Sequence, residues 1–198
     1  MNGPSRRLRY NVAISLDGFI VHADGTAASV VRDNGVSFDA LHAQCDTLVM
    51  GRKTYDCMFG MGEHNPLRKY SKESLVVVSK TLKSEDHPRV TIVSGDFIGY
   101  VADLKNTDGR DIGLMGGGQL VEPCLDAGIV DSVQTAIMPL MLRKGDKMVD
   151  ESARAPLGRS KLELVDCKRW GTGGVVMCKY NVSAGRKMAA SMGDAMFG

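Results

Sequence analysis

The sequence has no long apolar run and no pattern of metal-ligating residues. Its five cysteines never stand in C-x-x-C spacing, and its four histidines show no H-E-x-x-H pattern. The sequence therefore offers no zinc motif and no C-x-x-C redox motif. No apolar run is long enough to span a membrane, and the amino terminus lacks the apolar segment of a signal peptide. Because an odd number of cysteines favours reduced thiols, we expect a soluble cytoplasmic protein.

The sequence also lacks a large excess of charge of one sign. It has 25 Lys and Arg against 23 Asp and Glu, a formal net charge of +2 at pH 7. Basic residues are scattered, so we expect a small-molecule substrate and neither nucleic acid nor membrane as a partner. A length of 198 residues suffices for one domain with a real core. We expect that domain over residues 1–182 and a flexible tail, rich in Ala, Ser, Met and Gly, over residues 183–198.

Strand-like and helix-like segments alternate along most of the chain. Apolar, β-prone segments fall at residues 8–16, 47–50, 75–78, 89–94 and 111–115. Helical patterns fall at residues 38–44, 52–58, 97–105 and 120–127, the last ended by Gly128. Three strand-like segments without intervening helices follow, at residues 130–137, 161–168 and 175–180. This order predicts an α/β sandwich whose central sheet is mostly parallel, with antiparallel strands at the carboxyl-terminal end.

Three consecutive glycines stand where an apolar segment meets the helix expected at residues 120–127. The segment reads Met115-Gly116-Gly117-Gly118-Gln119-Leu120. A strand that ends in glycines and opens a helix presents unpaired backbone N–H groups at the positive end of the helix dipole, which suits a phosphate or pyrophosphate. A plain strand-to-helix turn would also explain a triple glycine.

A second motif of this kind stands upstream, in Met50-Gly51-Arg52-Lys53-Thr54-Tyr55. Arginine, lysine and threonine all donate hydrogen bonds to phosphate oxygens. Cations at a helix N-terminus oppose the macrodipole unless an anion binds there, although solvated surface charges would also explain Arg52 and Lys53. Two phosphate-type elements in one α/β domain suggest a dinucleotide.

The order of four motifs resembles the dihydrofolate reductase family. These motifs are Ala-Ile-Ser-Leu-Asp-Gly-Phe-Ile at residues 13–20, Met-Gly-Arg-Lys-Thr-Tyr at 50–55, Val-Val-Val-Ser at 76–79 and Met-Gly-Gly-Gly at 115–118. The chain is more closely similar to the bacterial-type branch that includes the C-terminal reductase domain of the riboflavin-biosynthesis protein RibD. The resemblance covers residues 8–180. It implies a dihydrofolate reductase-like three-layer sandwich, NADPH as hydride donor and a homodimer, for which residues 130–142 are a candidate interface.

The resemblance also implies roles for individual residues. It places the nicotinamide on backbone groups of Ala13 and Ile20, and a threonine near the substrate at Thr135. It assigns the pyrophosphate and the 2′-phosphate side of the adenosine to Gly51, Arg52, Lys53 and Thr54. Val78, Ser79 and Lys80 would flank the adenine ribose. Gly116, Gly117 and Gly118 would receive the pyrophosphate at the helix N-terminus, with a cis peptide bond between the first two glycines. Met115, Gln119 and Leu120 would also bind the cofactor.

The identity of the substrate and of the acid is open at this point. The resemblance implies hydride transfer from C4 of NADPH to a pterin-like or ribosylaminopyrimidine-like heterocycle, including 5-amino-6-(5-phosphoribosylamino)uracil. The proton would come from solvent or from Asp39, although an aspartate in the first turn of a helix also stabilises the helix dipole. Asp17 is a weaker candidate because its turn position already explains it. The alternatives are an NADPH-binding module without turnover, a dihydrofolate reductase, and an interaction protein that uses the fold as a scaffold.

Overall fold

The structure is a computed structural model that describes residues 5–21, 39, 42–149 and 161–183. These residues contain an eight-stranded sheet with the strand order β4-β3-β2-β5-β1-β6-β8-β7. The strands are β1 (Leu8–Ser15), β2 (Cys45–Gly51), β3 (Leu75–Val78), β4 (Thr91–Val93), β5 (Asp111–Met115), β6 (Ser132–Met138), β7 (Lys161–Trp170) and β8 (Val175–Ser183). From β4 to β6 neighbouring strands are parallel, whereas β8 and β7 pair antiparallel. The expected sheet is therefore confirmed.

In the part of the chain that the structure describes, three α-helices connect parallel strands: α3 (Arg52–Gly60), α4 (Phe97–Lys105) and α5 (Gly118–Asp126). The side chain of Asp96 caps α4 by accepting a hydrogen bond of 2.9 Å from the backbone N–H of Gly99. Gly128 follows the end of α5 with a φ of +67°, a left-handed conformation that glycine adopts at low cost. This is the helix end that the sequence predicts. Two short 3₁₀ turns, Gly62–His64 and Pro66–Lys69, follow α3 and were not predicted.

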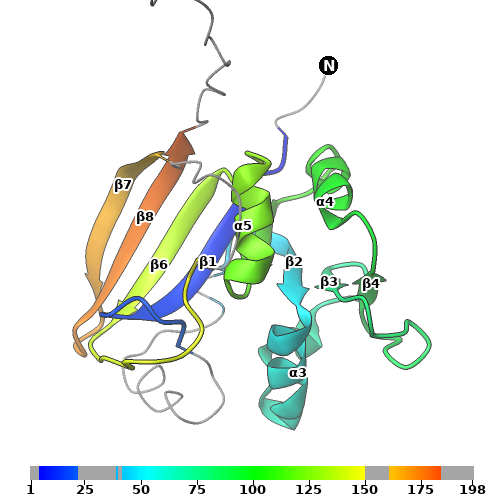
Figure 1. Ribbon diagram of the computed structural model, residues 1–198, viewed down its shortest axis with the longest axis horizontal. Coiled ribbons are helices and arrows are strands. Elements are labelled where there is room, and N and C mark those ends of the chain that lie inside the picture. Colours follow the sequence, from blue (N-terminus) through cyan, green and yellow to red (C-terminus); the bar gives the residue numbers. More distant parts are fainter. Residues whose placement is uncertain (1–4, 22–38, 40–41, 150–160, 184–198) are drawn as a thin grey trace, which may run out of the picture.

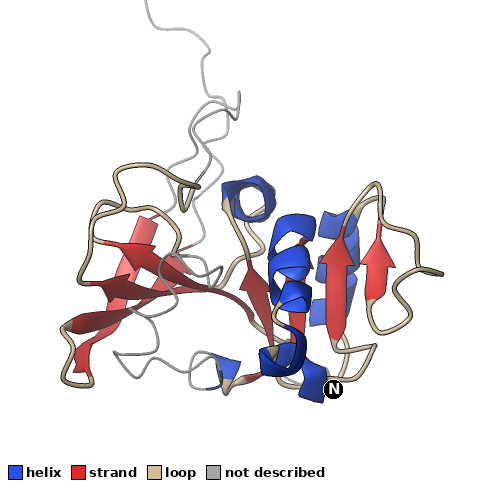
Figure 2. Cartoon of the chain, turned by 90° about the horizontal axis from the view of Figure 1, so that it is seen from below, coloured by secondary structure: helices blue, strands red, loops and turns tan. Residues whose placement is uncertain are grey.

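The parallel half of the sheet is covered on both faces, which makes three layers. Side chains alternate along β2, so that Val49 faces one hydrophobic cluster while Leu48 and Met50 face another. The first cluster contains residues of α4 and α5, and the second contains Tyr55 of α3. Such burial on two faces explains why these strands read as nearly continuous apolar runs. Figures 1 and 2 show the described helices gathered at this half of the sheet.

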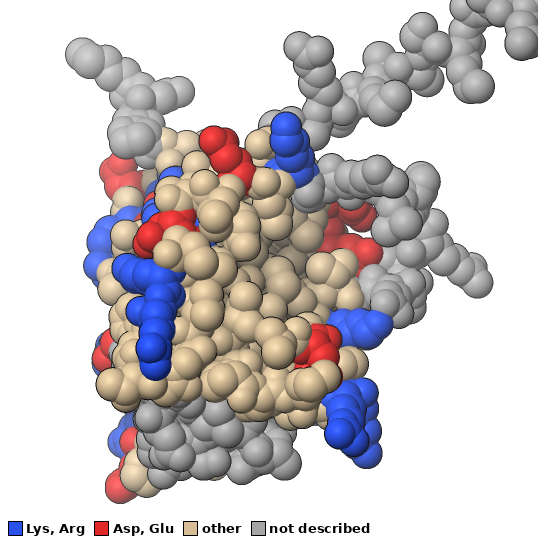
Figure 3. Space-filling model, turned by 90° about the vertical axis from the view of Figure 1, so that its left-hand side faces the viewer, with Lys and Arg blue, Asp and Glu red and all other residues tan. Residues whose placement is uncertain are grey.

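The antiparallel half has a different environment. Residues of β6 and β8, including Met138 and Val175, form a third cluster on one face. The outer strand β7 is exposed along nearly its whole length, and its exposed apolar residues are Leu162, Leu164 and Val165. Figure 3 views the molecule from this side and shows uncharged residues across the middle of the face. Strand β6 itself lies inside the sheet between β1 and β8, and five of its seven residues are buried.

The amino ends of the parallel strands are joined by ion pairs. Arg6, which precedes β1, is paired with Asp46 at the start of β2 and donates a hydrogen bond of 2.7 Å to the hydroxyl of Thr47. Arg9 of β1 is paired with Asp111 at the start of β5. Both arginines are buried. At this edge of the sheet, the charges of the two arginines are therefore neutralised by aspartates of the same chain.

Several expectations are modified by the structure. The strand expected at residues 89–94 is reduced to β4, because Val90 still belongs to a turn in which its N–H bonds to His87 O at 3.3 Å. The helix expected at 38–44 falls partly outside the described residues, and the tail at 183–198 does so except for Ser183. None of the helices in the described part of the chain is long and apolar enough to cross a membrane.

Candidate cofactor-binding site

The ends of three neighbouring strands form one row at the carboxyl edge of the parallel sheet. Strand β2 pairs with β3 through Gly51 and Val78, and with β5 through Met50 and Met115. Because these strands are parallel, the turns that follow them emerge at the same edge. The two glycine motifs and the turn after β3 are therefore neighbours in space.

The chain topology opens a crevice at this edge. The connection from β2 leads through α3 toward β3, whereas the connection from β5 leads through α5 in the opposite direction, past β1 to β6. Right-handed crossovers in opposite directions place α3 and α5 on opposite faces of the sheet, in agreement with the two hydrophobic clusters. Open α/β sheets bind ligands at such a switch point, outside the carboxyl ends of the strands.

The two glycine motifs approach each other closely. Gly116 has a φ of +139°, and a Cβ atom built on it would lie 3.3 Å from the Thr54 hydroxyl oxygen and 3.8 Å from the backbone nitrogen of Gly51. A side chain here would be strained and would fill the space between the starts of α3 and α5. No peptide bond in the described residues is cis. The cis bond expected between Gly116 and Gly117 is therefore wrong for this structure, in which the positive φ of Gly116 makes the turn.

Both helices begin without a partner for their dipoles. Neither Gly51 nor Gly117, the residues at the N-caps of α3 and α5, offers a side-chain cap, and neither helix has an acidic residue in its first turn. The first N–H groups of an α-helix have no acceptor within the helix. The two helix starts thus present partial positive charge toward the same crevice.

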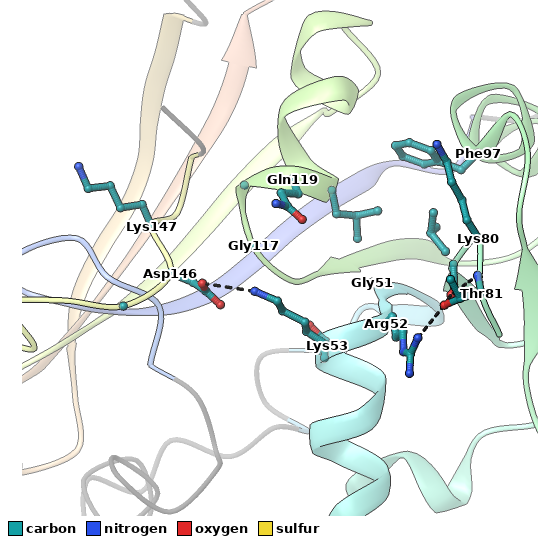
Figure 4. A pocket seen from close by; sticks show the side chains of 16 residues that line it. Gly51, Arg52, Lys53, Lys80, Thr81, Phe97, Gly117, Gln119, Asp146 and Lys147 are labelled. Carbon is teal, nitrogen blue, oxygen red and sulfur yellow. Dashed lines mark hydrogen bonds and ion pairs between the residues drawn. The ribbon is translucent and has the colours of Figure 1, made fainter. Parts of the chain in front are cut away.

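The crevice is a pocket of about 750 Å³, within the range of ligand-binding cavities. Figure 4 shows its lining from close by. Eleven of the predicted residues line it, namely Gly51, Arg52, Lys53, Thr54, Val78, Ser79, Lys80, Gly117, Gly118, Gln119 and Leu120. Five lining residues were not predicted as site residues, namely Thr81, Phe97, Gly145, Asp146 and Lys147. The lining carries four cationic side chains and one carboxylate, so it favours an anionic ligand.

The turn after β3 is held in shape by hydroxyl groups. The Ser79 hydroxyl accepts hydrogen bonds of 3.2 Å from the N–H groups of both Thr81 and Leu82. Arg52 donates a hydrogen bond of 2.6 Å to the Thr81 hydroxyl, as Figure 4 shows, and contacts Asp56 at 3.2 Å. Ser79 thus shapes the turn, and Arg52 is aimed across the pocket at the end of β3. The Thr81 contact links two strand ends, which the local sequence does not reveal.

The opposite wall comes from residues 145–147, which belong to the long connection after β6. Lys53 Nζ lies 3.7 Å from an Asp146 carboxylate oxygen across the pocket (Figure 4). The backbone N–H of Ile20 donates a hydrogen bond of 2.8 Å to Asp146 O. The buried Tyr10 hydroxyl lies 3.1 Å from Gly116 O and 3.3 Å from Met148 O. Tyr10 therefore connects this wall to the turn that opens α5.

Four of the residues predicted to bind the cofactor do not line the pocket. Ile20 Cδ1 would be 3.5 Å from a Cβ atom on Gly117, so its side chain borders the pocket. Ala13 O accepts a hydrogen bond of 2.9 Å from the N–H of Val21, which occupies one of the backbone groups expected to hold a nicotinamide. Met115 is buried beneath the turn, and Gly116 lies between the two helix starts.

The structure does not bring the candidate catalytic residues into the pocket lining. Asp39 is exposed and forms an ion pair with Lys69, and this hydrogen bond raises the pKa of the Lys69 ammonium. Thr135 is buried in β6, beside Val12 of β1. Asp17 accepts hydrogen bonds from the Ser15 hydroxyl and from two backbone N–H groups, which lower the pKa of its carboxyl. Asp17 is thus ionised near neutral pH and holds the turn rather than donating a proton.

Comparisons with known proteins assign this architecture to a class. A crystal structure of a Shewanella sp. PV-4 protein, assigned provisionally to riboflavin biosynthesis, has a TM-score of 0.69 and 24% sequence identity over 89% of this chain and 99% of that chain. Enterococcus faecalis dihydrofolate reductase has a TM-score of 0.61 and 14% identity over 89% of this chain and 96% of that chain. The fold is therefore the dihydrofolate reductase-like fold that the sequence predicts.

The sequence comparisons define the family within that fold. The RibD C-terminal domain family matches residues 61–176, more than half of the chain. The protein belongs to this family, as the motif resemblance indicates. A similar curated relative is the uncharacterized protein YyaP of Bacillus subtilis (strain 168), 27% identical over 192 residues, which cover 91% of this chain and 97% of YyaP.

Proposed function

We propose that the protein is an NADPH-dependent reductase that transfers a hydride to a small heterocycle of the pterin or ribosylaminopyrimidine class. The observation that carries this proposal is the convergence of two uncapped helix starts on one cationic pocket at the carboxyl edge of the sheet. The family and the fold support a reductase. The similar Enterococcus faecalis enzyme is described as complexed with NADP(H), which supports a nicotinamide cofactor.

The residues of the pocket fit such a dinucleotide. A Cβ atom on Gly116 would lie 3.3 Å from the Thr54 hydroxyl oxygen. The glycine therefore keeps the space between the starts of α3 and α5 open for a ligand. The starts of α3 and α5 would bind the pyrophosphate through backbone N–H groups. Arg52 and Lys80, at the β3 end of the pocket, would bind the 2′-phosphate that distinguishes NADPH from NADH. When bound, NADPH supplies the hydride from C4 of its nicotinamide ring.

The chain itself would contribute orientation and exclusion of water. Ile20 and the wall at residues 145–147 border the pocket beside Gly117, where the nicotinamide end would enter. The substrate proton would come from solvent, because Asp17 is held ionised and Asp39 lies in an exposed ion pair. Most of the rate enhancement would therefore come from positioning the ring against the substrate.

A second candidate function is an NADPH-binding module without turnover. The position of Asp39 favours it, because the acid inferred from the resemblance does not line the pocket. The two candidates share the cofactor site and differ only in substrate turnover.

A homodimer remains part of the proposal. Within the candidate interface at residues 130–142, the exposed Met141 would be available for such a contact, and light scattering of the purified chain would measure the oligomeric state.

The first experiment is a titration with NADPH and NADH, followed by nicotinamide fluorescence and by thermal stability. We expect tighter binding of NADPH, lost in Arg52→Ala and in Gly117→Val, whose side chain would enter the pocket. Gly95→Ala is the matched control, because no atom lies within 4 Å of a Cβ atom at this position and its residue does not line the pocket. Absence of binding for both nucleotides would overturn the proposal.

Turnover separates the two candidates. Oxidation of NADPH would be followed by its absorbance in the presence of three kinds of candidate substrate. These are dihydropterins, dihydrofolate and pyrimidines of the 5-amino-6-(5-phosphoribosylamino)uracil type. Turnover with any of them supports the reductase. Tight NADPH binding without turnover across these substrates supports the binding module.

A further inference from the structure

The hairpin formed by β7 and β8 brings two cysteines into contact. Cys167 and Cys178 are direct register partners, and their Sγ atoms lie 3.4 Å apart. Partners in antiparallel strands have Cα atoms about 4.5–5.5 Å apart, within the span of about 4.4–6.8 Å that a disulfide requires. The backbone therefore already meets this requirement, and small side-chain rotations would suffice to bring the two sulfur atoms to bonding distance.

A β-bulge creates this pairing. Leu164 pairs with Tyr180, but Asp166 pairs with Lys179, so one extra residue of β7 lies between them. Without the extra residue, Asp166 rather than Cys167 would stand opposite Cys178. Bulges shift the residues that follow by one position relative to the partner strand. The contact between the thiols thus depends on a specific irregularity of the sheet.

The two thiols differ in their access to solvent. Cys167 is exposed on the outer strand, whereas Cys178 is only 6% exposed. A small reagent can reach Cys167 first, and Cys178 is then close enough to react within the protein. The remaining cysteines lie on other elements, Cys45 in β2, Cys57 in α3 and Cys124 in α5.

We propose that Cys167 and Cys178 are a reversible redox-modification site that closes to a disulfide by exchange with a low-molecular-weight disulfide such as oxidised glutathione. This inference is independent of the proposed reductase function. The Cys167 thiolate attacks one sulfur of glutathione disulfide, the S–S bond of glutathione breaks, and one glutathione thiolate leaves. The Cys178 thiolate then attacks Cys167 sulfur, the mixed disulfide breaks, and the second glutathione leaves. The protein loses two electrons, glutathione disulfide gains them, and the two protein protons pass to the two glutathione thiolates.

The local chemistry sets how the site should be measured. The hydrogen bond to Cys178 raises the pKa of the Cys167 thiol, so little thiolate is present near neutral pH and exchange is slow. The position of equilibrium is therefore the informative quantity. Closure would covalently fix the exposed strand β7 to β8, which itself pairs with β6.

The test equilibrates the full-length chain in buffers of reduced and oxidised glutathione, traps free thiols by alkylation and maps the peptides by mass spectrometry. The expected product is a single species that has lost two hydrogen atoms, with the peptides of Cys167 and Cys178 joined. It should unfold at a temperature roughly 5–10 °C above that of the reduced chain. Added dithiothreitol should reverse both changes.

Three variants make the test specific. Cys167→Ser should abolish the cross-link, and Cys178→Ser should instead accumulate a mixed disulfide of Cys167 with glutathione. Cys57→Ser is the matched control and should cross-link as the unaltered chain does. The proposal would be overturned by a persistent mixed disulfide at Cys167 in the unaltered chain, by a bond between other cysteines, or by unmodified thiols throughout the buffer series.

Discussion

The two edges of the parallel sheet differ in how their positive charges are balanced. At the amino ends of the strands, Arg6 and Arg9 are buried and paired with Asp46 and Asp111. At the carboxyl ends, the pocket has four cationic side chains and a single carboxylate, and two helix starts add partial positive charge. One edge contains the anions that its cations need, whereas the other is arranged to receive an anion from outside.

Because of this difference, we expect the cations at the amino edge to contribute to folding stability and those at the carboxyl edge to contribute to ligand binding. A buried ion pair that loses one partner leaves an uncompensated charge in the interior, at a large cost in folding free energy. The side chains of Arg52 and Lys53 are mostly solvated, with 52% and 81% of their area exposed, so their removal should change folding little. Substitutions at the two edges should therefore affect different measurements.

The largest expected effect is at the amino edge. Arg6→Ala should lower the free energy of unfolding by about 2–3 kcal/mol, because it removes the ion pair with Asp46 and the hydrogen bond to the Thr47 hydroxyl. Urea unfolding followed by circular dichroism measures this change. The control is Lys168→Ala, which removes an exposed pair with Asp166 at 3.6 Å and should cost less than about 0.5 kcal/mol. Equal losses in both variants would remove the distinction between the buried and the exposed pairs.

Alkaline pH should weaken the fold through buried thiols. Burial raises the pKa of Cys45, at the amino edge, to about 11 and that of Cys124, beneath the pocket in α5, to about 12, from an ordinary 9.0. The unfolded chain therefore releases these protons at lower pH than the folded chain does. The stability is complete below pH 9 and declines above it, by about 1 kcal/mol per thiol for each pH unit until the folded thiols ionise.

Urea unfolding between pH 8 and pH 10.5 measures this decline. Cys45→Ala should show a shallower dependence on pH than the unaltered chain, because one of the two thiols is gone. The matched control is Val49→Ala, which removes buried apolar atoms from the same strand but no ionisable group. An unchanged pH slope in Cys45→Ala would contradict the assignment.

A smaller effect is expected at the carboxyl edge from Tyr10→Phe. The variant keeps the buried ring but removes the hydroxyl that contacts Gly116 O and Met148 O. It should lower the free energy of unfolding by about 1–2 kcal/mol and also weaken NADPH binding, because the two walls of the pocket lose their connection. Tyr70→Phe, outside the pocket lining, is the control for loss of a tyrosine hydroxyl. A loss of stability with unchanged NADPH affinity would restrict Tyr10 to a structural role.

The smallest effect should come from Asp146→Asn. The carboxylate of Asp146 is the one negative side chain in the pocket lining, 3.7 Å from Lys53 Nζ. Its neutralisation should tighten NADPH binding by roughly threefold at low salt, with an unchanged unfolding temperature. Glu63→Gln, an exposed carboxylate outside the pocket lining, should leave the affinity unchanged. Weaker binding in Asp146→Asn would show that the carboxylate holds the ligand rather than competing with it.

Local signals explain how much of the site could be predicted from the sequence. The glycines at 51 and 116–118 mark strand ends, and the patterns that follow them mark α3 and α5, so most of the pocket lining was predicted. Asp146 and Lys147 were missed as site residues because their place depends on pairing of their segment with Phe19 and Ile20, far away in the sequence. The sequence around Asp39 predicts the start of a helix. It does not determine how far that helix lies from the pocket.

The sequence by itself determined the alternation of strands and helices, the apolar strands of the parallel half and the two glycine-led helix starts. These features follow from side-chain periodicity and from backbone preferences that act over a few residues. Only the tertiary structure decided the strand order, the wall at residues 145–147 and the contact of Cys167 with Cys178. These depend on register between distant segments, and a single extra residue in β7 changes which side chains meet.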